Sequence, residues 1–441
     1  MLTPGQTLSL TIEKPAVGGR MIARADGQVV LVAGAIPGER VSARIERVGK
    51  ALAYAETLGA EQPSADRRVP FSDPLCGGCL YAHIAYPRQL EIKSLVIADA
   101  FSRIARVTLP APVAVAPSPP EGYRMRARLH LRGTRLGFFR EGTHEVCEAR
   151  ATRQLLTATC DVLDGLSAAL GRHHTDTVRE VEVSENMSAS DRVVHLEASP
   201  CVDVRSLELL AATNGVTGLT VAGPTFGGVR VLAGTAYVSD VIALGDQPPL
   251  TIRRHVLAFF QGNRYLLPDL AAHVIEHVPP GSAMIDLYAG AGLLAVAAAR
   301  VRGAHVTAVE GDRIAAEDLE ANATAAGGAV TPVHQSVERF VGGRLPQQAS
   351  ASAKASADHH LHVETVIVDP PRTGMSREAL DGVVGLSARR IVYVSCDVAT
   401  LARDARRFLD AGYALARIDA FDLFPNTPHV ETVVVFQSSI V

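Results

Sequence analysis

The first 60 residues alternate apolar and polar side chains in short runs. Apolar residues recur at every second position from Leu8 to Ile12 and from Val41 to Ile45, and Gly18-Gly19 and Pro37-Gly38 interrupt the pattern. A period of two is typical of strands with one buried face, and such glycine and proline pairs are typical of tight turns. We therefore predict a small five-stranded β-barrel over residues 1–60.

The pattern changes in the middle of the chain. Residues 62–80 are rich in proline, aspartate and cysteine without a clear period, which predicts a cysteine-bearing knuckle followed by a helix at about 88–106. Residues 122–240 contain short apolar runs typical of strands, with helical patterns near 152–171 and 204–213. We expect a central domain of mixed α+β type here.

Apolar strand patterns and helical patterns alternate from about residue 265 onward. The predicted strands are 283–287, 306–310, 365–369, 391–395 and 432–437. Buried strands separated by helices indicate a doubly wound, Rossmann-like α/β sheet. The low-complexity tract at 346–358 consists of small residues that cannot bury a face, so we expect a mobile surface insertion there.

At 441 residues the chain is long enough for two to four domains. We predict a multidomain protein with limits at 1–60, 61–110, 111–245 and 246–441. No apolar run approaches the roughly 18 residues of a membrane span, and the first residues lack a secretory signal pattern. We therefore expect a soluble, cytoplasmic monomer whose six cysteines do not form disulfides.

A glycine loop, Asp286-Leu-Tyr288-Ala-Gly290-Ala-Gly292, follows the predicted strand at 283–287 and opens a helix. Glycines let the backbone approach a ligand closely, and a helix start favours anionic groups. Glu310 ends the next strand, where a ribose diol needs an acceptor. The loop alone fits a dinucleotide or S-adenosylmethionine equally. Its spacing, together with Asp369-Pro-Pro-Arg372 after a later strand, favours S-adenosylmethionine.

The chain resembles the RNA 5-methyluridine methyltransferases that carry an N-terminal TRAM domain. The resemblance spans nearly the whole chain and rests on these motifs in order: Val-Ala-Gly-Ala-Ile-Pro-Gly-Glu (32–39), Cys-Gly-Gly-Cys (76–79), Phe-Phe-Gln-Gly-Asn (259–263), Asp-Pro-Pro-Arg (369–372), Val-Ser-Cys-Asp (394–397) and Phe-Pro-Asn-Thr-Pro-His-Val-Glu (424–431). It implies that the barrel is a TRAM domain, which engages RNA, and that the C-terminal domain binds S-adenosylmethionine.

Uracil carbon 5 is a poor nucleophile until a thiolate adds at carbon 6 and produces an enolate. Cys396 suits that nucleophilic role, and Glu431 suits the base that then removes the carbon 5 proton. The resemblance implies that Phe259, Asp369 and Arg372 contact the target uridine. The cofactor residues that we expect from the glycine loop and the resemblance are Gln261, Asp286, Tyr288, Gly290, Gly292, Glu310 and Asp369.

Cys76, Cys79 and Cys147 form a second candidate site. In the family, these cysteines and a further one before the Cys-Gly-Gly-Cys motif hold a 4Fe-4S cluster, which thiolates ligate. Here Asp73-Pro74 stands where that first cysteine is expected. Three interpretations stay open: a 4Fe-4S cluster with Asp73 or solvent at one iron, a zinc site, and a knuckle without metal.

We expect RNA as the macromolecular partner. Alternation over 124–132 places Arg124, Arg126, Arg128, His130 and Arg132 on one strand face, as suits a stripe along phosphates. The family points first to 23S ribosomal RNA and second to transfer RNA. Two further alternatives remain: an RNA-binding protein with an inactive methyltransferase domain, and an enzyme that methylates a nitrogen. Asp397 replaces the family's asparagine beside Cys396, and we expect its charge to raise the thiol pKa.

Overall fold

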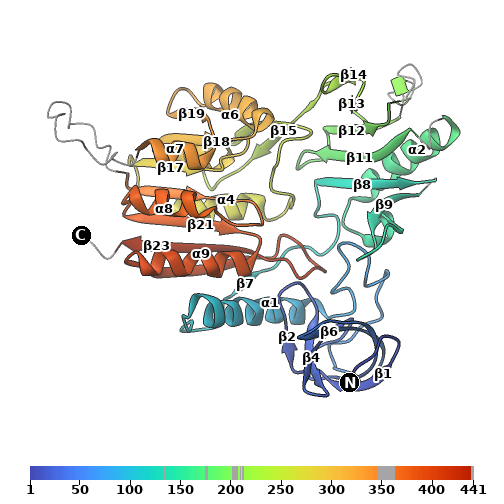
Figure 1. Ribbon diagram of the computed structural model, residues 1–441. Coiled ribbons are helices and arrows are strands. Elements are labelled where there is room, and N and C mark those ends of the chain that lie inside the picture. The colour runs from blue at the N-terminus through green and yellow to red at the C-terminus, as the bar shows by residue number, and fades with distance from the viewer. Residues whose placement is uncertain are drawn as a thin grey trace.

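A computed structural model describes residues 1–133, 135–173, 177–200, 207, 208, 210, 213–344 and 363–438. The strands of this described part form four sheets, of six, seven, two and eight strands. The predicted insertion at 346–358, Cys201 and most of the helix predicted at 204–213 lie outside the described residues. Figure 1 shows the three larger sheets in separate places: the N-terminal sheet at the bottom, the central sheet on the right and the C-terminal sheet on the left.

The N-terminal sheet has six strands in the order β1-β5-β6-β4-β3-β2 and curls into a small barrel (Figure 1). Its strands are β1 (Thr7–Thr11), β2 (Lys14–Pro15), β3 (Met21–Ala25), β4 (Gln28–Ala33), β5 (Arg40–Val48) and β6 (Leu52–Gln62). The prediction of five strands missed β2, because two residues are too few to show a period. The alternating apolar side chains, such as Leu10, Val30 and Val41, fill the barrel core.

The central sheet has seven strands in the order β10-β9-β8-β11-β12-β13-β14. They are β8 (Arg126–Arg132), β9 (Arg135–Phe139), β10 (Val146–Glu148), β11 (Val178–Glu185), β12 (Arg192–Ala198), β13 (Gly218–Ala222) and β14 (Arg230–Gly234). A 3-10 turn (Arg150–Thr152) and helix α2 (Thr157–His173) complete this region, so the predicted helix begins five residues later than expected. Ala127, Leu129 and Leu131 point into its core.

The C-terminal sheet has eight strands in the order β19-β18-β17-β20-β21-β23-β22-β7. They are β7 (Val115–Ala116), β17 (Ala283–Leu287), β18 (His305–Glu310), β19 (Val330–His334), β20 (Thr365–Val368), β21 (Arg390–Ser395), β22 (Tyr413–Phe421) and β23 (Glu431–Ser438). The five predicted strands agree with the structure within one residue at each end. All neighbouring pairs are parallel except those of β23, which runs antiparallel between β21 and β22.

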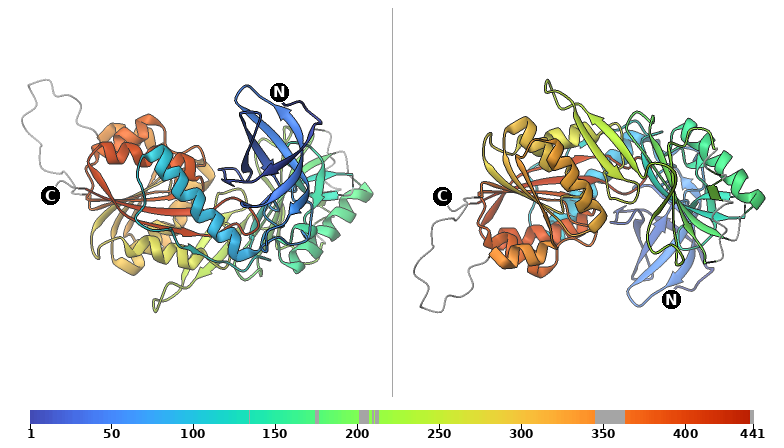
Figure 2. Two further views of the ribbon diagram at one scale, coloured as in Figure 1. Left: turned by 90° about the horizontal axis from the view of Figure 1, so that it is seen from below. Right: turned by 90° about the horizontal axis from the view of Figure 1, so that it is seen from above.

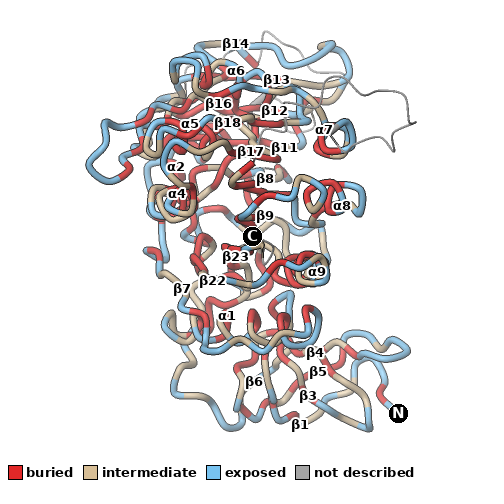
Figure 3. The backbone as a smooth tube through the Cα atoms, turned by 90° about the vertical axis from the view of Figure 1, so that its left-hand side faces the viewer, coloured by how far each residue is buried: buried red, intermediate tan, exposed pale blue. Residues whose placement is uncertain are grey.

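Helices cover both faces of this sheet, as the burial-coloured trace in Figure 3 makes visible. Helices α4 (Leu267–Glu276), α5 (Leu293–Arg302) and α6 (Arg313–Ala325) pack on one face. The other face carries α1 (Tyr86–Ala100), the π-helical turn η1 (Phe101–Ala105), α7 (Val337–Arg344), α8 (Arg377–Gly385) and α9 (Val398–Asp410). Strand order reverses between β17 and β20, where ligands of such sheets bind.

Several elements pack against parts of the chain that are distant from them in the sequence. Helix α1 comes early in the chain but lies across the C-terminal sheet (Figure 2), and β7 pairs with β22. The hairpin of β15 (Tyr237–Ile242) and β16 (Leu250–His255) contacts both the central sheet and helix α6. The four domain limits therefore stay a prediction, since these elements span the limits at 110 and 245.

Candidate active site

The glycine loop connects β17 to α5 in a strained conformation. Tyr288, Gly290 and Gly292 all have positive φ angles, of 62°, 55° and 88°. Gly292 has a φ angle that side-chain-bearing residues rarely adopt, so a glycine is favoured where the loop enters the helix. Glu310, at the end of β18, accepts hydrogen bonds from the Gly290 and Asp312 amides, each at 2.7 Å.

A pocket lies over this loop at the strand reversal, and mostly apolar side chains with a few polar groups line it, as is typical of small-molecule sites. Its polar lining comes from Gln261, Asp286, Tyr288 and Asp369, and Gln261 Nε2 donates to Asp369 Oδ2 at 3.1 Å. Both carboxylate oxygens of Asp286 are buried without a hydrogen-bond partner in the described structure. Such a carboxyl group fits a cationic ligand, and S-adenosylmethionine carries an ammonium and a sulfonium group.

The structure places most of the expected cofactor residues in this pocket, including Gly290, and Phe259, which was expected to contact the uridine, also lines it. Glu310 and Gly292 do not line it and instead shape its loop. Sequence reasoning missed the side of helix α4 that closes the pocket, formed by Leu270, Ala271 and Val274. Their helical spacing just before the first predicted strand of the doubly wound sheet was the signal that could have found them.

Strand pairing brings the proposed nucleophile and base together. Ser395 at the end of β21 lies opposite Thr432 in β23, so Cys396 and Glu431 follow at the same edge of the sheet. Asp369 follows the neighbouring strand β20, whose Val368 lies beside Tyr393. Because these side chains come from adjacent strand ends, they meet beside the cofactor pocket.

Burial and mutual repulsion shift the pKa values of these groups. Burial first, and Glu431 second, raise the pKa of the Cys396 thiol to about 12, while Arg372 opposes the shift. Burial also raises the pKa of Asp369 to about 7. Burial, assisted by the charge of Asp369, holds the pKa of Glu431 well above its usual range, and neither oxygen of Glu431 has a hydrogen-bond partner in the described structure.

Asp397 has a local structural role that the sequence prediction did not include. Its Oδ1 accepts the Thr400 amide at 2.8 Å and caps helix α9. The pKa of Cys396 is raised, but burial, Glu431 and Asp369 raise it, and the contribution expected from the Asp397 charge is not seen. His429 was also missed; it is half-buried near Arg372 and Asp397, and its partial burial lowers its pKa to about 4.

A basic groove adjoins the cofactor pocket and shares Phe259, Phe260 and Gln261 with it. Arg124, Arg126, Arg128, Arg372 and Phe424 supply the rest of its basic and aromatic lining. The predicted alternation holds in β8, where Arg126 and Arg128 lie opposite the core face. Both pair with Glu182, yet the Arg128 side chain remains 63% exposed. Phe259 is 60% exposed at the junction, so it is not a core residue.

The segment that leads to Glu431, residues 422–430, is held from several directions. Gln89 of α1 and Asn426 exchange two hydrogen bonds, of 3.0 and 2.9 Å. The Tyr81 amide donates to Asn426 O at 2.8 Å. In the barrel, a Cβ atom on Gly19 would lie 2.8 Å from Pro428 Cγ. The barrel and α1 therefore both contact the chain that positions Glu431.

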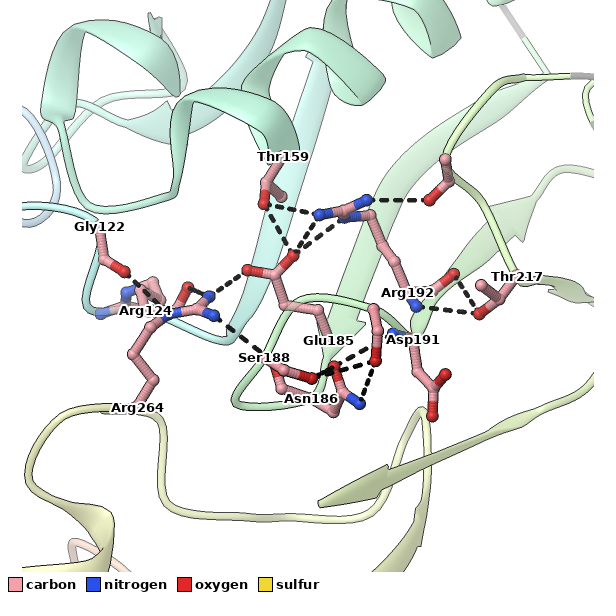
Figure 4. A network of polar contacts seen from close by, with 12 residues as sticks. Gly122, Arg124, Thr159, Glu185, Asn186, Ser188, Asp191, Arg192, Thr217 and Arg264 are labelled. Atoms are coloured by element: carbon pink, nitrogen blue, oxygen red, sulfur yellow. Dashed lines mark hydrogen bonds and ion pairs between the residues drawn. The ribbon is translucent and has the colours of Figure 1, made fainter. Parts of the chain in front are cut away.

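A buried polar network holds the segment that carries Phe259 and Gln261 (Figure 4). Arg264 donates to Gly122 O and Met187 O at 2.9 and 2.8 Å and pairs with Glu185. Arg192 and Thr159 also bind Glu185. This network connects the central sheet to the start of helix α4, because Arg264 lies just before that helix.

The three candidate metal cysteines come together beside the central sheet. Cys76 and Cys79 are buried with Ala82, and Cys147 of β10 packs against them. The Asp73 carboxylate lies next to this cluster, but Oδ2 accepts from Arg140 Nε at 2.8 Å and Oδ1 from the Leu75 amide at 2.9 Å. Cys160 is buried in the core of the central sheet and lies apart from this cluster.

Comparison with known proteins agrees with this architecture. A family model described as tRNA (Uracil-5-)-methyltransferase matches residues 222–439, and a TRAM domain model matches residues 2–58. A protein named "Uncharacterized RNA methyltransferase" from Streptomyces avermitilis is 30% identical over 459 residues and 98% of each chain. The 23S rRNA (uracil(1939)-C(5))-methyltransferase RlmD of Pseudomonas putida is 29% identical over 448 residues, covering 98% of this chain and 94% of its own.

A solved structure shows the same fold. The tRNA (uracil-54, C5)-methyltransferase of Pyrococcus abyssi, in complex with S-adenosyl-L-homocysteine, superposes with a TM-score of 0.73 at 22% identity, covering 97% of this chain and 99% of its own. In the described part of the chain, no helix is both long and apolar enough to cross a membrane. The predicted S-adenosylmethionine-dependent methyltransferase activity on RNA uracil is confirmed, and the chain belongs to the family of TRAM-containing RNA uracil-5-methyltransferases.

Proposed function

We propose that the chain methylates carbon 5 of a specific uridine in 23S ribosomal RNA, with Cys396 as nucleophile and Glu431 as base. The observation that carries this proposal is the register of β21 and β23, which sets Cys396 against Glu431 beside the cofactor pocket. The full-length relative from Pseudomonas putida, named for 23S rRNA, supports the choice of RNA. Transfer RNA is the alternative, because the family model and the similar fold carry tRNA names.

The residues of the site have separable roles in this mechanism. S-adenosylmethionine, when bound, supplies the methyl group. Arg372 lies beside Cys396 and lowers the thiol pKa against the effect of burial, which favours the thiolate that adds to uracil carbon 6. Because burial raises the pKa of Glu431, its ionised carboxylate is a stronger base than an exposed glutamate and can remove the carbon 5 proton.

The target uridine must leave its RNA stack to reach Cys396. Phe259 is exposed where the basic groove meets the cofactor pocket, so its ring can stack on an extruded base and offset part of the unstacking cost. Arg128, on the same groove, can contact phosphates. Gln261 and Asp369 border both the cofactor side and the nucleophile, and we assign them to hold the two reactants in line.

The experiment is methyl transfer from labelled S-adenosylmethionine to total RNA from cells that lack this gene, followed by nucleoside analysis and mapping. We expect label in 5-methyluridine of 23S ribosomal RNA. Label in transfer RNA would show that transfer RNA, and not 23S ribosomal RNA, is the substrate. Label in a nucleoside other than 5-methyluridine would contradict the roles of Cys396 and Glu431.

The nucleophile is tested by Cys396→Ala, with Cys160→Ala as the matched control because Cys160 lies in the core of the central domain. The Cys396 variant should lose methyl transfer and fail to form a covalent complex with RNA that contains 5-fluorouridine. The control should keep both activities. Methyl transfer by Cys396→Ala would contradict the mechanism.

A 4Fe-4S cluster at Cys76, Cys79 and Cys147 is part of the proposal. Three thiols in an apolar setting fit thiolate ligation, and solvent would complete the site because hydrogen bonds engage the Asp73 carboxylate. No step of methyl transfer runs through this group. Iron and sulfide analysis of protein purified without oxygen tests it: Cys79→Ser should lose both elements and stability, whereas absent metal and an unchanged melting temperature would leave a metal-free knuckle.

A further inference from the structure

The C-terminal end of helix α4 carries a group of potential metal ligands on a face next to the one that lines the cofactor pocket. His273, Glu276 and His277 have the spacing i, i+3 and i+4, which puts them on one helical face. His273 Nδ1 lies 3.3 Å from Glu276 Oε1, and His277 Nε2 lies 3.6 Å from the same oxygen. Among the described residues, this is the one group whose three candidate ligand atoms all lie within 4.8 Å of one another.

These separations match those around a tetrahedral metal ion. Zinc binds imidazole nitrogen and carboxylate oxygen at about 2.0–2.1 Å, and two such ligands at a tetrahedral angle lie roughly 3.4 Å apart. The two imidazoles are only 12% and 14% exposed, and His277 Nε2 has no hydrogen-bond partner in the described structure. The nitrogen lone pair is therefore available to an ion without breaking an existing bond.

A carboxylate from a second element, Asp419 of β22, lies close to the ring nitrogen of His273 that the metal would not use. Asp419 of β22 places Oδ2 at 3.2 Å from His273 Nε2, the nitrogen that stays free when Nδ1 binds a metal, and the two atoms are within ion-pair distance without a hydrogen bond in the described structure. Histidine ligands are commonly oriented by such a carboxylate. Arg417 pairs with both Asp419, at 2.7 Å, and Glu276, at 3.5 Å. Its side chain is 51% exposed, so it can leave Glu276 for solvent while it keeps Asp419.

We propose that His273, Glu276 and His277 bind a divalent transition metal ion of the zinc class, with Asp419 orienting His273. The set of two imidazoles and one carboxylate favours zinc, cobalt or nickel over magnesium or calcium. The ion binds the C-terminal end of α4, and His273 connects it to Asp419 of β22. Since a neighbouring face of α4 lines the cofactor pocket and β22 pairs with the strand that begins at Glu431, the bound ion stiffens the frame of the active site without touching the reactants.

The test measures how many zinc ions the full-length chain binds. Protein is stripped with a chelator, titrated with Zn²⁺ by calorimetry, and analysed for bound metal after desalting. Because Cys76, Cys79 and Cys147 also offer zinc ligands, the informative quantity is a difference. We expect the wild type to hold one more zinc ion per chain than H273Q/H277Q. His305→Gln, an exposed histidine of the same sheet, should equal the wild type.

The neighbouring carboxylates make the test more specific. Asp419→Asn should lower the zinc affinity of this site by about 10- to 100-fold, as expected when a group that orients a histidine ligand is lost. Glu276→Gln removes a ligand at a half-exposed position that the fold tolerates. Equal zinc stoichiometry in the wild type and H273Q/H277Q, with the Glu276→Gln variant also unchanged, would overturn the proposal and leave these residues as a surface ion-pair cluster.

Discussion

The buried ion pair between Lys93 and Asp422 offers a strong test of how α1 positions the active site. Lys93 Nζ lies 2.5 Å from Asp422 Oδ1, both side chains are fully buried, and the same nitrogen donates to Phe424 O at 3.1 Å. Burial lowers the pKa of Lys93, and the charge of Asp422 opposes that shift. Lys93→Met keeps the length of the side chain but leaves the Asp422 carboxylate buried without its cation.

The expected loss follows from that isolated charge. Removing one partner of a buried pair costs about 3–5 kcal/mol, whereas replacing both with neutral groups is often close to neutral. Lys93→Met should therefore destabilise the segment 422–430, and the double change Lys93→Met/Asp422→Asn should recover most of the loss. Lys14→Met is the matched control, because the Lys14–Asp99 pair also contacts α1 but is 45% and 30% exposed. An exposed pair contributes about 1 kcal/mol or less.

Amide hydrogen exchange of residues 422–430 is the direct assay, since a multidomain chain does not unfold in one step. Faster exchange should appear in Lys93→Met, together with a lower kcat because the segment leads to Glu431. The melting temperature should fall in parallel. If Lys93→Met matches Lys14→Met in exchange and activity, the buried pair does not hold the segment and the reasoning is refuted.

Three further predictions concern catalysis, RNA binding and pH. Glu431→Gln should accumulate the covalent RNA adduct of Cys396 on denaturing gels, and a free enzyme after methylation would argue for another base. Arg128→Ala should weaken RNA binding and lower the salt-dependence slope by about 0.7–0.9, in filter binding at several salt concentrations; an unchanged slope would remove Arg128 from phosphate contact. Burial lowers the pKa of His83 to about 4, from about 6.5 in the unfolded chain, so between pH 6.5 and 4 only the unfolded state takes up the proton. Stability should therefore fall by about 1.4 kcal/mol per pH unit from this residue as the pH decreases, and urea midpoints of His83→Gln should show a smaller slope than those of the wild type.

Local pattern sufficed for five strands of the C-terminal sheet and for several site residues, whereas β19 and β22 were not predicted. The strands at 283–287 and 391–395 stand out because an apolar run bounded by polar residues is a property of neighbouring positions. The glycine loop is equally local, since its backbone needs positive φ angles. For Cys396 and Glu431, the motifs around them pointed to the roles that we propose.

The tertiary structure decided which distant surfaces meet. Lys93 and Asp422 are 329 positions apart, and nothing in the local pattern of either segment indicates the other. The same holds for the pairing of β7 with β22 and for Asp419 behind His273. Periodicity reports which face of an element is buried, whereas a partner across the core depends on how whole elements pack. The sequence by itself therefore determined the elements and the chemistry, and packing decided the contacts that hold that chemistry in place.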